Sequence, residues 1–207
     1  MAWQVALQQL LNGLALGSVY ALIALGYTMV YGIIKLINFA HGEMYMLGAY
    51  FGFYAITMFR FSLVPAMLLS MTAAAVVGVL LERIAYRPLR NSPRISVLIT
   101  AIGASLLFQS TAQLVFGASF KPFPQVMSFR RIQLGPVFIT NRQLLIFGVA
   151  LLLMVALHVL VTYTKFGKAM RAVARDKEAA LLMGINVDRI ISCTFALGSA
   201  LAATAGI

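Results

Sequence analysis

The longest polar interval of this chain reads KFGKAMRAVARDKEAALLMGINVDR and spans residues 165–189. It lies between two long apolar segments, in a protein whose remaining sequence is mostly apolar. Good helix formers dominate it, and no Gly or Pro interrupts it between Gly167 and Gly184. The interval therefore predicts one short helix, which Gly184 ends by supplying a residue that tolerates the left-handed conformation.

The predicted helix is amphipathic. Three basic side chains spaced three and four residues apart share one face: Lys168, Arg171 and Arg175. Met170, Val173 and Leu181 lie roughly opposite them. A helix of this kind between two membrane spans lies on a surface. Charge and periodicity alone leave two surfaces open, the anionic lipid headgroups or another protein.

Composition places the chain in a membrane. Its 207 residues are 62% hydrophobic and 10% charged, whereas a soluble domain has about 25% charged residues. The net charge of +11 does not indicate a nucleic-acid partner, because the charges fall in the gaps between apolar runs and form no continuous stripe. Cys193 is the single cysteine, and the few His and acidic residues provide no set of metal ligands. We expect no metal and no cofactor, and no basic segment marks a cleavable signal peptide.

The apolar residues form six runs, at residues 1–34, 44–59, 61–81, 95–120, 143–164 and 190–207. These runs predict an all-α integral membrane protein, a polytopic helical bundle of about six spans in a single transmembrane permease domain over residues 1–207. The last run continues to the end of the chain without a polar flank, so we interpret the sequence as truncated. The prolines between residues 121 and 142 predict a loop, with a short hairpin within residues 126–134.

The second run is short for a span. Its sixteen residues cover about 24 Å as a helix, against an apolar bilayer core of about 30 Å. It must therefore take residues from the preceding polar segment, tilt little, or form part of a broken helix. Two pairs of glycines with GxxxG spacing predict close helix packing; they are Gly13 with Gly17 and Gly48 with Gly52.

Basic residues are distributed unequally between the two sides. If each run crosses once, the gaps at residues 32–43, 82–94 and 165–189 share one side and hold eleven of the sixteen Lys and Arg residues. The other side holds five. The positive-inside rule makes the first side cytoplasmic, which places the 165–189 interval in the cytoplasm and the N-terminus outside.

A polar break separates the first two runs and contains Asn38, His41, Gly42 and Glu43. One interpretation is a cytoplasmic turn in which Glu43 favours a helix N-terminus. The other is a segment that lines the translocation path, because polar groups are costly in lipid and Gly42 weakens the helix. A metal site lacks a third ligand, and nothing in the break indicates acid–base catalysis.

Two motifs carry a resemblance to a known family. Glu178-Ala179-Ala180 followed by Gly184 resembles the first half of the EAA loop of ABC-importer permeases. The string NGLALGSVYALIALGYTMVYG at residues 12–32, continued by INFAHGE at residues 37–43, resembles the first transmembrane region of LivH-type permeases. These are the inner-membrane subunits of bacterial branched-chain amino-acid ABC importers.

The resemblance implies a non-enzymatic translocation subunit of the bacterial inner membrane. It implies a second permease subunit, most simply in a heterodimer, two cytoplasmic ATPase subunits and a periplasmic substrate-binding protein. The 165–189 interval would be the coupling helix, and six residues would form the ATPase contact: Arg171, Arg175, Glu178, Ala179, Ala180 and Gly184. No GxxxxGK[ST] nucleotide motif occurs in the chain. The alternative is a secondary transporter or channel for a small polar solute, in which Glu43 binds an ion or proton.

Overall fold

The fold is known from a computed structural model that describes residues 2–90, 92–124, 126, 130–135 and 137–207. Its helices are α1 (Ala2–Ile34), α2 (His41–Thr57), α3 (Leu63–Leu81), the π-helical turn η1 (Glu82–Tyr86), α4 (Arg94–Phe116), α5 (Asn141–Tyr163), α6 (Lys165–Arg175), α7 (Lys177–Leu182) and α8 (Val187–Ala205). A two-stranded hairpin, β1 (Arg131–Leu134) and β2 (Val137–Thr140), precedes α5. The predicted helical membrane bundle is confirmed.

The apolar runs correspond closely to the long helices. Among the described residues, α1, α3 with η1, α4, α5 and α8 are long and apolar enough to cross a membrane. The second run becomes α2, which begins at His41 and has 17 residues, about 26 Å in length. It therefore takes residues from the polar break, one of the three solutions that its short apolar run allowed.

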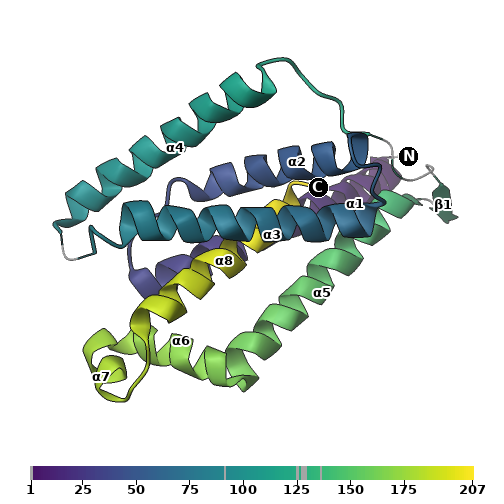
Figure 1. The fold of residues 1–207 in the computed structure, drawn as a ribbon. Helices are drawn as coiled ribbons and strands as arrows, with labels where there is room; N and C mark the ends of the chain where they lie inside the picture. The colour runs from purple at the N-terminus through teal and green to yellow at the C-terminus, as the bar shows by residue number, and fades with distance from the viewer. Residues whose placement is uncertain (1, 91, 125, 127–129, 136) are drawn as a thin grey trace.

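Helix α8 is the centre of the bundle, and α1, α2 and α3 pack around it (Figure 1). Phe195, Ile191 and Ala202 of α8 are almost completely buried. Helices α4 and α5 lie at opposite edges, where α4 contacts α2 and α5 contacts α1. Their outward faces carry many exposed large apolar side chains, as expected for surfaces that meet lipid or another membrane subunit.

Small residues allow α8 to approach its neighbours. A Cβ added at Gly48 of α2 would lie 2.3 Å from the Cα of Ala203, and one at Gly52 would lie 2.7 Å from a side-chain carbon of Ile207. The GxxxG pair of α2 therefore faces the C-terminal segment. At Gly13 and Gly17 an added Cβ would meet no described atom within 4 Å, so the role of that pair in close packing stays a prediction about a partner helix.

The prediction of a hairpin within residues 126–134 was only partly right. Strand β1 lies inside this segment, but it pairs antiparallel with residues 137–140, with Leu134 opposite Val137. Gly135, at φ +61°, supplies the left-handed residue that a tight reversal needs. The rest of the predicted hairpin, at residues 127–129, lies outside the described residues.

The prediction of one helix between Gly167 and Gly184 was wrong. Asp176 breaks it into α6 and α7, because its backbone is extended, with φ −152° and ψ 115°. Its carboxylate accepts hydrogen bonds from the N–H groups of Glu178 and Ala179 at 2.9 and 3.0 Å. A good N-cap thus competes successfully with continued helix. The break also turns Leu181 outward, although the sequence placed it on the buried face.

Candidate functional site: the basic end of the bundle and a polar cleft

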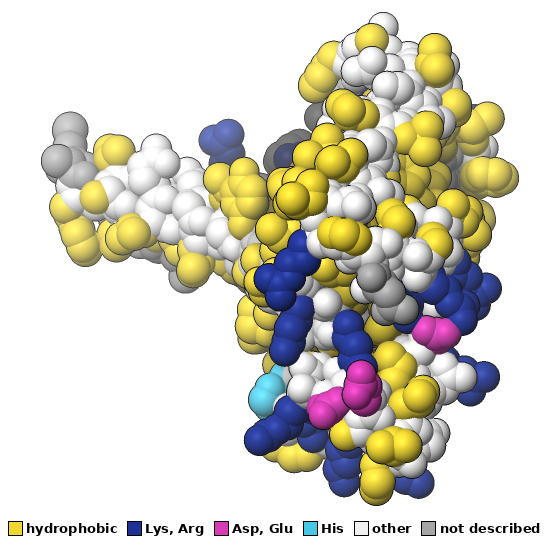
Figure 2. Space-filling model, turned by 90° about the vertical axis from the view of Figure 1, so that its left-hand side faces the viewer, with side chains coloured by type: hydrophobic (Ala, Val, Ile, Leu, Met, Phe, Trp, Pro, Cys, Tyr) yellow, Lys and Arg dark blue, Asp and Glu magenta, His cyan; other side chains and the backbone are white. Residues whose placement is uncertain are grey.

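The three polar gaps that were predicted to share one side lie at one end of the bundle (Figure 1). Figure 2 looks onto this end and shows Lys and Arg side chains gathered around a few acidic ones. A hollow of about 310 Å³ there is lined by Ile33 and Lys35 together with residues 173–178. Partial burial lowers the pKa of Lys177, and repulsion from Arg90 and Lys35 lowers it further, so charges from all three gaps interact.

A partly buried ion network joins two of these gaps. Arg90 contacts both Glu82, at the start of η1, and Asp188, at the start of α8. The second oxygen of Glu82 accepts a hydrogen bond from the hydroxyl of Ser192 at 2.5 Å. Glu82 is completely buried, whereas Arg87, which also contacts Asp188, is about half exposed. The network holds η1 against α8, and sequence reasoning did not identify it.

Helices α6 and α7 project from this end, and capping hydrogen bonds define where the projection begins and ends. The hydroxyl of Thr164 accepts a hydrogen bond from the N–H of Gly167 at 3.0 Å and thereby caps α6. At the far end, Gly184 has φ +79°. The N–H groups of Gly184 and Ile185 donate to the carbonyls of Leu181 and Ala180, the hydrogen-bond pattern of a Schellman C-cap. The stop predicted at Gly184 is confirmed.

The two faces of α6 are as predicted. Met170 and Val173 are buried, while Lys168, Arg171 and Arg175 are exposed. Arg171 also donates to the carbonyls of Val161 and Thr162 at the end of α5, so part of its donor capacity is used within the chain.

The residues of the EAA-like segment fall into two groups. Glu178 and Ala179 are exposed on α7, whereas Ala180 is buried. The structure adds an apolar tip that sequence reasoning missed: Leu181, Leu182 and Met183 are all strongly exposed, Leu182 at 88%. Three consecutive apolar residues after Glu-Ala-Ala were a visible signal. Helical periodicity continued through Asp176 assigned Leu181 to the buried face instead.

The polar break contains two residues that hydrogen-bond within the bundle and one, Glu43, that faces a cleft. Asn38 is buried and accepts a hydrogen bond from the hydroxyl of Tyr86 at 2.9 Å. His41 is buried too, with its Nε2 3.2 Å from the carbonyl oxygen of Ile23. Gly42 is exposed. Asn38 and His41 thus join the break to η1 and α1.

Glu43 points from the first turn of α2 toward α4. Its Oε1 accepts hydrogen bonds from the hydroxyl of Ser105 and the amide of Gln109, both at 2.8 Å. Among the described residues its carboxylate accepts hydrogen bonds only from α4, while its place in the first turn also suits the positive end of α2. Sequence reasoning missed Ser105, Gln109 and Gln113. Their spacing of four residues within the apolar fourth run would have indicated a polar stripe on one face.

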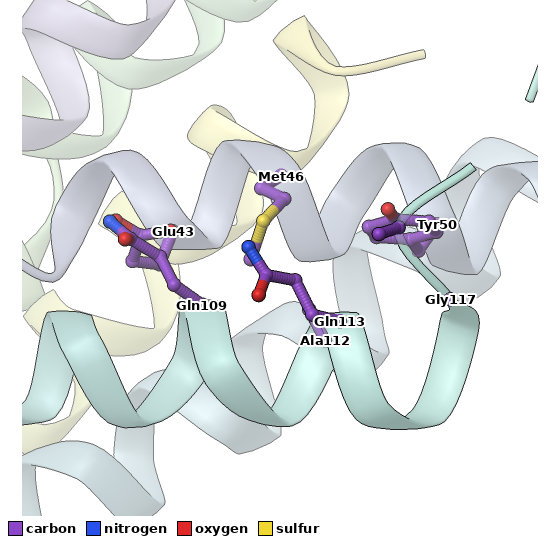
Figure 3. Close-up of a pocket in the computed structure, with 8 residues that line it drawn as sticks. Glu43, Met46, Tyr50, Gln109, Ala112, Gln113 and Gly117 are labelled. Carbon is purple, nitrogen blue, oxygen red and sulfur yellow. The ribbon is translucent and has the colours of Figure 1, made fainter. Parts of the chain in front are cut away.

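A cleft of about 390 Å³ follows this seam between α2 and α4. In Figure 3, Glu43, Met46 and Tyr50 of α2 lie opposite Gln109 and Gln113 of α4. The candidate site residues of this chain therefore lie in two places. One is the basic projection at the end of the bundle, and the other is a polar cleft between two of its helices.

A bundle of apolar helices with a polar cleft between two of them and a basic, capped projection at one end defines a multi-pass membrane permease. Residues 9–207 match the family model described as "Branched-chain amino acid transport system / permease component". The chain belongs to this family.

Curated relatives agree with the family match. The chain is 45% identical to the high-affinity branched-chain amino acid transport system permease protein BraD of Pseudomonas aeruginosa, over 97% of the chain and 69% of the relative. It is 43% identical to LivH of Escherichia coli over the same shares. It is 28% identical to a probable LivH of Methanocaldococcus jannaschii, over 89% of the chain and 60% of the relative. No solved structure matches the chain.

Proposed function

We propose that this chain is a transmembrane permease subunit of an ABC importer that moves branched-chain amino acids across the inner membrane, with ATP hydrolysis carried out by partner subunits. The names of the relatives, which are permease proteins of branched-chain amino acid transport systems, supply the substrate class. The observation that carries the mechanism is the α6–α7 projection, with its charged face and its exposed apolar tip.

The projection fits a protein groove better than a lipid surface. The apolar face of α6, formed by Met170 and Val173, is already packed within the chain and is not available to enter a membrane. What α7 leaves exposed is a tip of Leu181, Leu182 and Met183 beside Glu178. A contiguous apolar patch rimmed by charges is typical of a protein interaction site. The tip is the part of this subunit that an ATPase would hold.

Movement of the projection reaches the membrane helices directly. Helix α6 packs against α5, α1 and α8, and the chain passes from Gly184 through a short link into α8, the central helix. On this proposal, closure of two ATPase subunits shifts α6–α7 and the attached helices as rigid bodies. The ion network at Arg90 makes η1 move together with the start of α8.

The translocation path follows the cleft at Glu43. Asn38 and His41 support it by holding the start of α2 against η1 and α1. Gly42 has no described atom near an added Cβ, which leaves space beside the path. A second permease subunit covers the open side of the cleft and the exposed face of α1 at Gly13 and Gly17. A periplasmic binding protein delivers the substrate to this pair.

The test is reconstitution of the permease pair with its ATPase subunits and binding protein in proteoliposomes. We expect ATP-dependent leucine uptake, and we expect Leu182→Asp to abolish copurification of the ATPase and stimulated ATP hydrolysis while the permease still inserts. Ile37→Asp, an apolar-to-acid change at an exposed position between α1 and α2 at the same end of the bundle and outside the candidate spans, is the control and should retain both. Leucine uptake that needs no ATPase would instead identify a secondary transporter.

A further inference from the structure

The cleft between α2 and α4 has two chemically different halves. At one end Glu43 lies with Ser105 and Gln109. Toward the other end the walls are Met46, Ala112 and Tyr50, and the ring of Tyr50 stacks on Phe116 with centroids 4.3 Å apart. The volume of about 390 Å³ lies within the range of small-molecule sites, about 300–1,000 Å³. A cleft with one carboxylate end and one aromatic end fits an amphipathic molecule, and it is far larger than a single ion requires.

Glu43 is held in a way that leaves one oxygen free for a ligand. Both donors reach the same atom, Oε1, at 2.8 Å, while Oε2 has no hydrogen-bond partner among the residues that the structure describes. The side chain is only 9% exposed, and no Lys or Arg is among the described residues that line the cleft. Oε2 is not among the buried side-chain atoms that lack a partner, so it is open to the cleft, where a cationic group of a ligand can pair with it. This open oxygen, in a cleft without a basic side chain, is the main indication of what binds here.

Gln113 adds a second polar contact farther along the cleft. It lies one helical turn beyond Gln109 on α4, and its amide faces α2 beside Met46 (Figure 3). An amide group offers two N–H donors and one acceptor, so it can hydrogen-bond a carboxylate without carrying a charge. The order along the cleft is therefore a carboxylate, two amides and an apolar wall.

We propose that this cleft is a binding site for aliphatic amino acids, in which Glu43 pairs with the α-ammonium group, Gln113 hydrogen-bonds the carboxylate and Met46, Ala112 and Tyr50 receive the apolar side chain. This inference rests on the proposed function, because it names the part of the path that recognises the substrate. Recognition depends on the ammonium group: Glu43 neutralises it, while Ser105 and Gln109 fix the orientation of the carboxylate.

The test measures ligand protection of a single cysteine in the assembled permease–ATPase complex in nanodiscs. Cys193→Ser removes the native thiol, and Ala118→Cys places a new one at an exposed residue that lines the cleft. The probes are leucine, 3-methylbutylamine, 2-hydroxy-4-methylpentanoate and 4-methylpentanoate. We expect the first two, which carry an ammonium group, to slow modification by a small thiol reagent, and the last two, which lack it, to have no effect.

Two variants separate recognition from folding. Glu43→Gln should raise the half-protecting leucine concentration by roughly 10- to 100-fold, as expected for loss of a hydrogen bond to a charged group, and should abolish the preference for leucine over its hydroxy analogue. Gln113→Leu should weaken protection by leucine but leave that by 3-methylbutylamine unchanged, because only leucine carries a carboxylate. Ser110→Ala, on α4 but outside the cleft lining, should behave like the unmodified complex.

Equal protection by leucine and 4-methylpentanoate, or unchanged protection in Glu43→Gln, would overturn the proposed site. Protection by sodium ions alone would also overturn it, in favour of an ion site. These outcomes are independent of the proposed function, which is tested by ATP-dependent leucine uptake of the unmodified importer. Normal uptake with no ammonium preference in the cleft would refute this inference only, whereas absence of uptake would refute the importer.

Discussion

Removal of the Arg90 side chain should strongly destabilise this fold, because it compensates a buried carboxylate. Its side chain is 14% exposed and contacts Glu82, which is completely buried. Replacing Arg90 with Ala leaves the charge of Glu82 without its partner. Removing one member of a buried ion pair costs about 3–5 kcal/mol. For a protein of this size, about 2–4 °C is expected per kcal/mol, which gives a fall in melting temperature of roughly 6–20 °C.

Two further variants isolate the cause. Arg87 also contacts Asp188, but both side chains are nearly half exposed, and such pairs contribute about 0–1 kcal/mol. Arg87→Ala should therefore shift the melting temperature by no more than a few degrees. The double variant Glu82→Leu with Arg90→Met removes both buried charges and should recover much of the stability lost in Arg90→Ala.

The assay is thermal unfolding of the detergent-purified permease. It is monitored by light scattering and by the reactivity of Cys193, a partly buried thiol on α8. Both signals should shift together if η1 and α8 separate. A fall in melting temperature after Arg90→Ala no larger than that after Arg87→Ala would refute the reasoning. So would a double variant as unstable as Arg90→Ala, because loss of packing alone would then explain the effect.

Three other predictions follow from single contacts. Gly48→Leu should prevent stable folding, because α2 and α8 must separate to admit the side chain. Gly13→Leu should leave the isolated subunit stable and reduce its association with a second permease, as size-exclusion chromatography would show. Asp176→Ala should lower stability by about 1 kcal/mol through loss of the α7 cap, measurable as a small fall in melting temperature that Asp176→Asn avoids. A reporter fused at Arg175 should lie in the cytoplasm and one at Lys121 in the periplasm, and the reverse pattern would contradict the proposed ATPase contact.

The break at Asp176 shows where local sequence rules conflict. Helix propensity favoured continuation from Gly167 to Gly184, while the same residues contained a good N-cap followed by Glu178. Propensities differ by less than about 1 kcal/mol per residue, and a cap contributes about as much, so neither rule decides alone. The buried side chains of Met170 and Val173 fix α6 against the bundle, and α7 is left to take another direction.

The sequence by itself determined the membrane class, the apolar runs that became the long helices, the polar segments that share one end, and the family. The first three depend on the transfer free energy or charge of a continuous segment, which adds up locally and needs no knowledge of neighbours. The family follows from the residue order of two motifs. The apolar character of residues 190–207 did not reveal that α8 is the central helix, because the glycines that pack against it lie on three other helices. Only the tertiary structure joined Glu43 to Ser105 and Gln109, more than sixty residues away. Which polar groups meet across a bundle depends on helix rotation and partner choice, and these are set by side-chain packing among distant segments.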